Sequence, residues 1–298
     1  MTQETMAPKE EFTPEQETNE NTRAFALNAL VISLNPLLQS DAPFSETQLR
    51  NAWLGNLEKN PDIFPDGWYI PPAHGIGVLI GNATQKSRTN YDNLRKFETK
   101  DGSFFNAEYP VMYVYASPVD RKTGIIGDAG LTLYNGTDPT VQQHLKTCFD
   151  INKLVATRVE VGITFSDVYN LTMRLAEEHG LINEVVSITD PRGANIGHTI
   201  PPGFAQWSKK EQEIVAKGTW QEILDIIRRK RLYVNGYEKT KLAPGTSITI
   251  EPRLNSIPDP NLPQASFHTT LQVGKNGKVR LLTDFDELFK LFGMDYMV

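Results

Sequence analysis

The stretch Leu242-Ala243-Pro244-Gly245-Thr246-Ser247-Ile248-Thr249-Ile250-Glu251-Pro252 decides the fold of this chain. Pro244 and Gly245 are typical turn residues. The segment from Ser247 to Ile250 is rich in β-branched side chains and predicts a strand. A carboxylate, Glu251, follows that strand directly. A side chain in this position is a candidate metal ligand.

Three further stretches, far apart in the chain, each contain a residue that can bind a metal. Asp128 lies in Gly127-Asp128-Ala129-Gly130-Leu131-Thr132, His198 in Asn195-Ile196-Gly197-His198-Thr199-Ile200-Pro201, and His268 in Ser266-Phe267-His268-Thr269-Thr270. Together with Glu251 they offer two carboxylates and two imidazoles. That mixture of oxygen and nitrogen donors suits one borderline divalent cation: Fe, Mn, Co or Zn.

The composition predicts one domain preceded by a tail. The chain has 298 residues, of which 39% are hydrophobic. Residues 1–23 contain almost no large apolar side chains, so they cannot bury enough surface to offset the entropy of ordering. We therefore expect a disordered tail at residues 1–23 and a single domain at residues 24–298.

Several classes of protein are disfavoured. The start of the chain lacks the features of a signal peptide, and no apolar run is long enough to span a membrane. The single cysteine, Cys148, is compatible with a reducing compartment, so a cytoplasmic location is expected. A net charge of −6 argues against nucleic acid as the main partner. The basic run at residues 228–231 ends a helical pattern and favours the helix dipole and solvent, with binding of an anionic substrate group as the minor alternative.

Helices and strands alternate in two similar series. The first has helices at residues 24–38 and 46–57, followed by strands at 75–80, 109–115 and 124–134 around a long loop at 82–106. The second has helices at 139–155 and 165–176, then strands at 247–250, 267–273 and 279–282, with an inserted helix at about 208–231. This order predicts an α+β fold in which a curved, mostly antiparallel sheet is covered by two helix pairs.

These motifs, taken in order, resemble the methionine aminopeptidase, prolidase and creatinase family, whose fold is called pita bread. The family's metal-binding stretch is similar to the one that begins at Asp128, and its Gly-His pair resembles Gly197-His198. Val161-Gly162-Ile163-Thr164 and the Leu-x-Pro-Gly and Ile-Glu-Pro elements around Glu251 also match. The resemblance covers roughly residues 24–291 and implies a metallopeptidase-like fold with a pseudo-twofold order.

The departures from the family are equally informative. Hydrolytic members hold two metal ions with two aspartates, one histidine and two glutamates. Here Ser117 stands where the first aspartate is expected, eleven residues before Asp128, and His268, or Phe267 in an alternative register, stands at the last glutamate. The remaining ligands, Asp128, His198, Glu251 and His268, carry a charge of −2, which one divalent ion balances. The resemblance therefore implies a site for a single metal.

Other histidines differ in what they suggest. The family's second histidine, which follows the Gly-His pair and acts on the amide, is absent here, so ordinary aminopeptidase activity is doubtful. A further family histidine near the substrate corresponds to His74, or to Asn90 in an alternative alignment. His144 and His179 lie on predicted helices and are interpreted as packed or solvated. Cys148 is interpreted as a small buried hydrophobic residue.

Three functions compete. The first is a metal-dependent hydrolase that acts on a small amino-acid or peptide-derived substrate, with His74 handling a proton. The second is a non-hydrolytic mononuclear Fe(II) or Mn(II) enzyme, an oxygenase or lyase. The third is an inactive relative that uses its cleft to bind a peptide or partner. A homodimer is expected only from the general frequency of homo-oligomers.

Overall fold

The computed structural model of the chain describes residues 11–40, 42–64, 66–84, 89, 98–184, 190, 193–201 and 206–298. It is a mixed structure of helices and small antiparallel sheets. Within these residues, none of the helices combines the length and the apolar character that crossing a bilayer requires.

The first helix begins far earlier than the composition predicts. Helix α1 spans Pro14–Gln39 and opens with a capping box between Thr13 and Gln16. The expected disordered tail at residues 1–23 is therefore wrong from residue 14 onward, and residues 1–10 lie outside the described part. The polar composition of this segment predicted disorder, but polar side chains in it are buried and hydrogen-bonded. Gln16, for example, donates to the carbonyls of Thr246 and Val273.

Two three-stranded sheets form the centre of the molecule. The first, in the order β2-β4-β5, joins Ile76–Gly81, Val111–Ala116 and Ala129–Tyr134. The second, in the order β11-β10-β7, joins Val279–Leu282, Thr269–Val273 and Ser247–Ile250. All of these pairs are antiparallel. The expected strands at 247–250 and 279–282 are confirmed.

Smaller strands complete the two halves. A third sheet, β6-β8-β9, and a two-stranded ribbon, β1-β3, are both antiparallel. Their bounds are Leu181–Asn183, Arg253–Ser256, Ala265–Ser266, Phe44–Ser45 and Phe104–Phe105. The strand expected at 267–273 corresponds to β10, which begins two residues later, at Thr269, and ends at Val273 as expected. Much of the loop expected at 82–106 lies outside the described residues.

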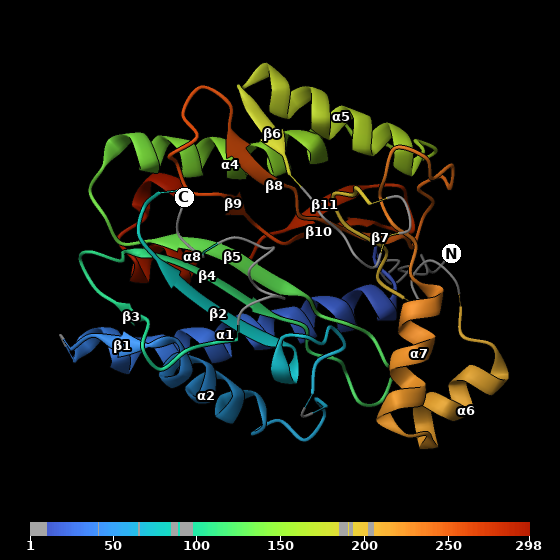
Figure 1. The fold of residues 1–298 in the computed structure, drawn as a ribbon. Coiled ribbons are helices and arrows are strands. Elements are labelled where there is room, and N and C mark those ends of the chain that lie inside the picture. Colours follow the sequence, from blue (N-terminus) through green and yellow to red (C-terminus); the bar gives the residue numbers. More distant parts are fainter. Residues whose placement is uncertain are drawn as a thin grey trace, which may run out of the picture.

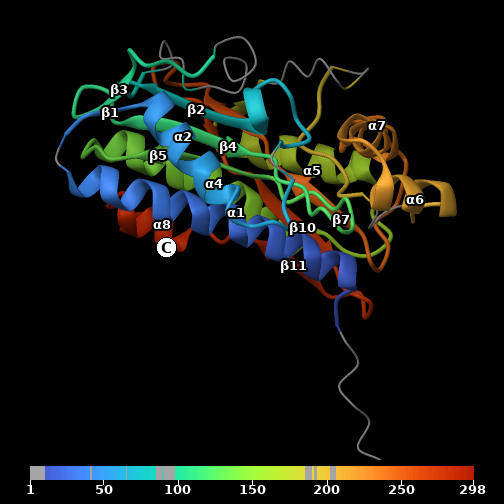
Figure 2. The same ribbon diagram turned by 90° about the horizontal axis from the view of Figure 1, so that it is seen from below.

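Helix pairs lie on opposite sides of these sheets. Helices α1 and α2 (Glu46–Leu57) contact the first sheet, while α4 (Pro139–Arg158) and α5 (Phe165–Glu178) contact strands of the second half. Figures 1 and 2 show the strands lying between the two pairs. A short helix, α8 (Asp286–Leu291), packs against α1. The α+β class and the covering helix pairs are as predicted, while the pseudo-twofold relation stays a prediction.

The inserted helix expected at about 208–231 is in fact two helices. Helix α6 spans Lys209–Lys217 and helix α7 spans Trp220–Lys230. Each begins with its own capping box, from Ser208 to Glu211 and from Thr219 to Glu222. Because each capping box starts a new helix, the segment forms two helices instead of one. Both views show α6 and α7 at one end of the molecule (Figures 1 and 2).

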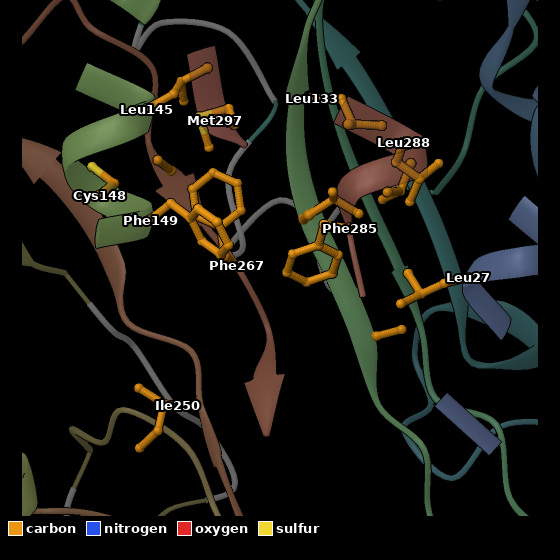
Figure 3. Packing of buried hydrophobic residues seen from close by; sticks show 14 of the residues in the cluster. Leu27, Leu133, Leu145, Cys148, Phe149, Ile250, Phe267, Phe285, Leu288 and Met297 are labelled. Atoms are coloured by element: carbon orange, nitrogen blue, oxygen red, sulfur yellow. The ribbon is translucent and has the colours of Figure 1, made fainter. Parts of the chain in front are cut away.

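An aromatic cluster anchors the sheets to the helices of the second half. Phe149 of α4 lies 5.0 Å from the ring of Phe267 and 5.4 Å from that of Phe289. Figure 3 shows the rings of Phe149 and Phe267 lying against each other. Phe267 is 1% exposed, so its side chain belongs to the core. Successive strand residues point to opposite faces, so the side chain of His268 is directed away from this cluster.

His144 makes the stability of this core depend on pH. Its Nε2 lies 2.8 Å from the carbonyl of Pro263, and Cys148, which is buried as predicted, packs beside the ring. Burial lowers the pKa of His144 below the ordinary 6.5. The unfolded chain therefore binds a proton that the folded chain resists, and stability falls as the pH drops below about 6.5.

Urea unfolding at several pH values tests this expectation. The free energy of unfolding of the wild type is expected to decline between pH 7 and pH 5, and a His144→Gln variant to decline less over the same window. Equal slopes for the two proteins would contradict the assignment of this dependence to His144.

Candidate metal centre

The four predicted ligands meet where the two central sheets join. Asp128 directly precedes β5, Glu251 directly follows β7, and His268 directly precedes β10. The backbone N–H of His268 donates to the carbonyl of Gly130 over 2.8 Å, which brings the start of β10 against β5. Figure 1 shows these strands side by side at the middle of the molecule.

His198 reaches the same place from a loop. Its backbone N–H donates to the hydroxyl of Thr249 over 2.9 Å, and its carbonyl accepts from the backbone N–H of Thr249. Gly197, with φ of 149°, allows this approach, because a Cβ there would lie only 2.1 Å from the carbonyl oxygen of Thr249. The Gly-His pair thus has a physical basis: only glycine lets the histidine backbone pair so closely with β7.

The side chains of these four residues are in contact and nearly inaccessible to solvent. His198 Nε2 lies 3.2 Å from Asp128 Oδ2 and 3.8 Å from Glu251 Oε1. His268 Nε2 lies 2.8 Å from Glu251 Oε2. Exposure ranges from 1% at Asp128 to 6% at His198. The structure therefore brings together all four residues predicted from the sequence.

In the neutral form of His198, lone pairs face each other across the centre. Its Nδ1 lies 2.9 Å from the carbonyl oxygen of Thr199, which can only accept, so Nδ1 carries the proton of the neutral ring. Nε2 is then a bare lone pair directed toward two carboxylates. Asp128 Oδ2 is buried and has no hydrogen-bond partner within the described part of the chain. Opposed acceptors of this kind are costly unless a cation lies between them.

The residues fit a divalent ion in their chemistry, although they do not form a preorganised cage. No group of three or more Cys, His, Asp and Glu side chains among the described residues has the full geometry of a metal site. His198 Nε2 and Asp128 Oδ2 are 3.2 Å apart. This distance matches that between neighbouring ligand atoms of one ion, which is about 3.0–3.4 Å. The 2.8 Å contact of His268 with Glu251 is a hydrogen bond that an ion would replace.

Two further side chains hold the carboxylates. Trp68 Nε1 donates to Asp128 Oδ1 over 2.5 Å, which leaves Oδ2 for the centre. Arg253, which is 3% exposed, donates to Glu251 Oε2 over 3.3 Å. Burial by itself raises the pKa of Glu251, but the contacts with the imidazole of His268 and the guanidinium of Arg253 outweigh burial and hold the pKa well below its usual range. Glu251 is therefore ionised at neutral pH.

Tyr113 adds a neutral phenol to the centre. Its hydroxyl lies 3.1 Å from His268 Nε2, and the residue is 1% exposed. Burial raises the pKa of Tyr113 well above its usual range, although Arg253 opposes the shift. The phenol thus retains its proton and can donate a hydrogen bond.

Sequence reasoning missed Trp68, Tyr113 and Arg253. A signal existed for Arg253, because residues two apart on an extended segment share a face, and this spacing could have placed it beside Glu251. Tyr113 lies in a predicted strand, but nothing local showed which face it occupies. Trp68 lies in an irregular segment that carries no signal of this kind.

The hydroxyl of Ser117 forms hydrogen bonds with the backbone and is not in contact with the four candidate ligands. Its hydroxyl accepts from the N–H of Tyr69 and donates to the carbonyl of Gly75, both over 3.2 Å. A Cβ added at Gly67 or Gly75 would lie 2.4 Å from its Oγ, so the space around this hydroxyl is closed. Ser117 therefore fills a closely packed space, whereas the family pattern has a metal-binding aspartate at this position.

A Ser117→Asp variant is expected to lose stability without gaining a second metal ion. The larger, charged side chain would be buried between Gly67 and Gly75 and would cost about 3 kcal/mol or more. Urea unfolding measures the loss, with Ser117→Ala as the matched control for the hydroxyl alone. A second equivalent of metal in Ser117→Asp would show that the position still belongs to the centre.

His74 lies in a different setting from the four candidates. Its Nδ1 is 2.8 Å from Asp66 Oδ1, and its side chain is 46% exposed. The residue has φ of 57°, a left-handed conformation that is uncommon outside glycine. Its predicted role in handling a proton stays a prediction. Asn90, the alternative to His74, lies outside the described residues.

Comparison with known proteins agrees with this geometry. The sequence profile of metallopeptidase family M24 matches residues 119–281, more than half of the chain. The chain belongs to metallopeptidase family M24. The match includes all four candidate ligands, and the predicted resemblance is thereby confirmed. A search of curated protein sequences finds no match.

Solved structures of a prolidase and of two aminopeptidases share the fold. The prolidase from Pyrococcus horikoshii OT3 is 13% identical with a TM-score of 0.59, over 92% of this chain and 63% of that one. Methionine aminopeptidase from Rickettsia prowazekii is 15% identical with a TM-score of 0.57, over 92% and 99% of the two chains. The X-Pro aminopeptidase from Thermotoga maritima MSB8 is 11% identical with a TM-score of 0.55, over 90% and 61%. The chain thus spans about three fifths of the prolidase and of the X-Pro aminopeptidase.

Proposed function

We propose that this M24 protein is a single-metal hydrolase that acts on a small amino-acid or peptide-derived substrate. Asp128, His198, Glu251 and His268 would hold one divalent ion. Prolidase and aminopeptidase structures with the same fold suggest peptides as the substrate class. We place the reaction in the cytoplasm, and the expectation of a homodimer rests only on general frequency.

One observation carries the proposal more than any other. His198 Nε2 and Asp128 Oδ2 are both buried and only 3.2 Å apart, and in the neutral form of His198 both atoms present lone pairs. A hydrogen bond to the Thr199 carbonyl fixes the tautomer, as second-shell partners of metal-bound histidines do. A purely structural pair would place a proton between nitrogen and oxygen.

The surrounding side chains have distinct tasks in this scheme. The four candidate ligands would hold a divalent ion, which would supply Lewis-acid chemistry toward a substrate carbonyl and a water molecule. Trp68 and Arg253 orient the carboxylates of Asp128 and Glu251 through the hydrogen bonds described above. The neutral phenol of Tyr113, which lies 3.1 Å from His268 Nε2, would donate a hydrogen bond to a substrate oxygen on which negative charge develops. His74 would accept or return a proton.

The ligand set also favours a second candidate. His268 supplies a second imidazole beside His198, and two histidines with carboxylates suit mononuclear Fe(II) in oxygenases. A non-hydrolytic Fe(II) or Mn(II) enzyme would use the same four residues. The third possibility, an inactive binding protein, would need no metal.

Metal reconstitution separates these functions. The full chain is stripped with a chelator and reloaded with Mn(II), Co(II), Zn(II) or, without oxygen, Fe(II). Cleavage of dipeptides, including X-Pro dipeptides, is then measured beside oxygen consumption. The hydrolase proposal expects metal-dependent cleavage that saturates near one equivalent. Iron-dependent oxygen uptake without cleavage would favour the second candidate, and no bound metal would leave only a binding role.

A further inference from the structure

Asn152 is a fully buried polar side chain on helix α4. It is 0% exposed, and the buried face of the helix around it is largely apolar, with Leu145, Cys148, Phe149 and Val155. Asparagine is a poor helix former, and burying an amide costs free energy unless the amide forms hydrogen bonds. The hydrogen bonds of Asn152 therefore decide what this residue contributes.

The amide of Asn152 joins the two segments that carry Glu251 and His268. Its Nδ2 donates to the carbonyls of Phe267 and Ile250 over 2.8 and 3.1 Å. Carbonyl oxygens only accept, so the NH2 group of the amide faces them. The Ile250 carbonyl belongs to the peptide group that leads into Glu251. The Phe267 carbonyl belongs to the peptide group that leads into His268.

The opposite edge of each peptide group is held by another segment. The N–H of Glu251 donates to the carbonyl of Ile196 over 2.7 Å, and the N–H of His268 donates to that of Gly130 over 2.8 Å. With both carbonyls bound to Asn152, each of the two planar peptide groups is held on both edges. Because the peptide group sets where the next Cα–Cβ bond starts, Asn152 helps to set the direction of both side chains.

The ladder between β7 and β10 stops short of the two ligands. Its register ends at the pair Ile250 and Thr269, so Glu251 and His268 lie just beyond the last pair. The Thr269 hydroxyl donates to the Ile250 carbonyl over 2.8 Å and lies 3.2 Å from Nδ2 of Asn152. The separation of the two ligands therefore depends on these side chains, where the backbone ladder no longer fixes it.

The oxygen of the same amide offsets part of its stabilising effect. Oδ1 of Asn152 is buried and has no hydrogen-bond partner within the described part of the chain. An unsatisfied buried acceptor costs free energy, so the net contribution of the amide to folding is smaller than its donated hydrogen bonds suggest. This balance favours a role in the geometry of the centre over a role in stability alone.

We propose that Asn152 is a positioning residue of the metal centre, whose amide holds Glu251 and His268 in the arrangement that lets both bind one divalent ion. The inference rests on the metal centre of the proposed function. Asn152 acts through the two peptide groups and is not itself a ligand. Removing a group that orients metal ligands typically weakens metal binding by about 10- to 100-fold, and an effect of this size is expected here.

Cobalt(II) serves as the probe, because its visible absorption depends on the geometry of its ligands. The metal-free full chain is titrated with Co(II), with affinity measured by calorimetry and the spectrum by absorption. Asn152→Leu removes the amide at similar volume, and Asn152→Ser removes it with a smaller, polar side chain. Both variants are expected to bind Co(II) about 10- to 100-fold more weakly and to change its spectrum. Wild-type affinity and spectrum in either folded variant would overturn the proposal.

A Leu145→Ala variant separates positioning from a general loss of stability. Leu145 is 0% exposed and lies two turns before Asn152 on α4, about 10.5 Å along the helix. Figure 3 shows Leu145 and Ile250 at opposite ends of the view. The variant is expected to unfold at a lower urea concentration while its Co(II) affinity and spectrum stay unchanged. Equal weakening of Co(II) binding in Leu145→Ala would assign the effect to stability and overturn the proposal.

Peptide cleavage, measured on the same samples, distinguishes the two proposals. A wild type that binds Co(II) more tightly than Asn152→Leu but cleaves no peptide contradicts the hydrolase and leaves the role of Asn152 standing. A wild type that cleaves peptides but binds Co(II) no better than Asn152→Leu contradicts only the role of Asn152. A wild type that binds no Co(II) contradicts both.

Discussion

A His268→Ala variant is expected to lose nearly all of the divalent ion that the wild type binds, about one equivalent per chain. His268 lies 2.8 Å from Glu251 and replaces the carboxylate expected from the family. Its loss removes one of four donors and also frees Glu251 from a hydrogen-bond partner. Elemental analysis of protein purified in the presence of metal gives the measurement.

The matched control is His179→Ala, which removes an exposed histidine at the end of α5. This variant is expected to retain the wild-type metal content. Two equivalents in the wild type would refute the single-ion inference. An unchanged content in His268→Ala would remove His268 from the site and leave Asp128, His198 and Glu251 as the only candidates.

An Arg23→Met variant is expected to lose about 3 kcal/mol or more of folding free energy. Arg23 of α1 is fully buried and donates to the carbonyls of Asp128 and Thr283 over 2.6 and 2.8 Å. It also pairs with Asp284 at 3.3 Å. Burial lowers the pKa of Arg23 to about 10, opposed by Asp284, so the side chain stays charged at neutral pH. Methionine fills part of the volume but leaves these acceptors without their donor.

Urea unfolding of Arg23→Met beside Arg174→Met measures the effect. Arg174 is exposed on α5, so its replacement is expected to change stability by no more than about 0.5 kcal/mol. Because Arg23 holds the backbone of Asp128, weaker metal binding is expected in Arg23→Met as well. Equal stability of the two variants would show that the hydrogen bonds of Arg23 contribute little.

Local sequence patterns predicted the features that depend on contacts between residues close in the sequence. Asp138 and Thr164 cap α4 and α5 as their spacing predicts, because the cap is a contact between residues two or three apart. The same reasoning applied at Thr13 would have found the true start of α1, but the polar composition of that segment argued for disorder. Its polar side chains are buried against backbone groups more than two hundred residues away.

The sequence by itself determined the family, the α+β class and the four candidate ligands, since each ligand lies in a short motif with fixed neighbours. The tertiary structure alone decided between His268 and Phe267, because the aromatic cluster takes up one face of that segment. It also decided the surroundings of the ligands. Arg23 and Trp68 reach Asp128 across 105 and 60 residues of chain, and contacts of that length leave no periodic trace in a sequence.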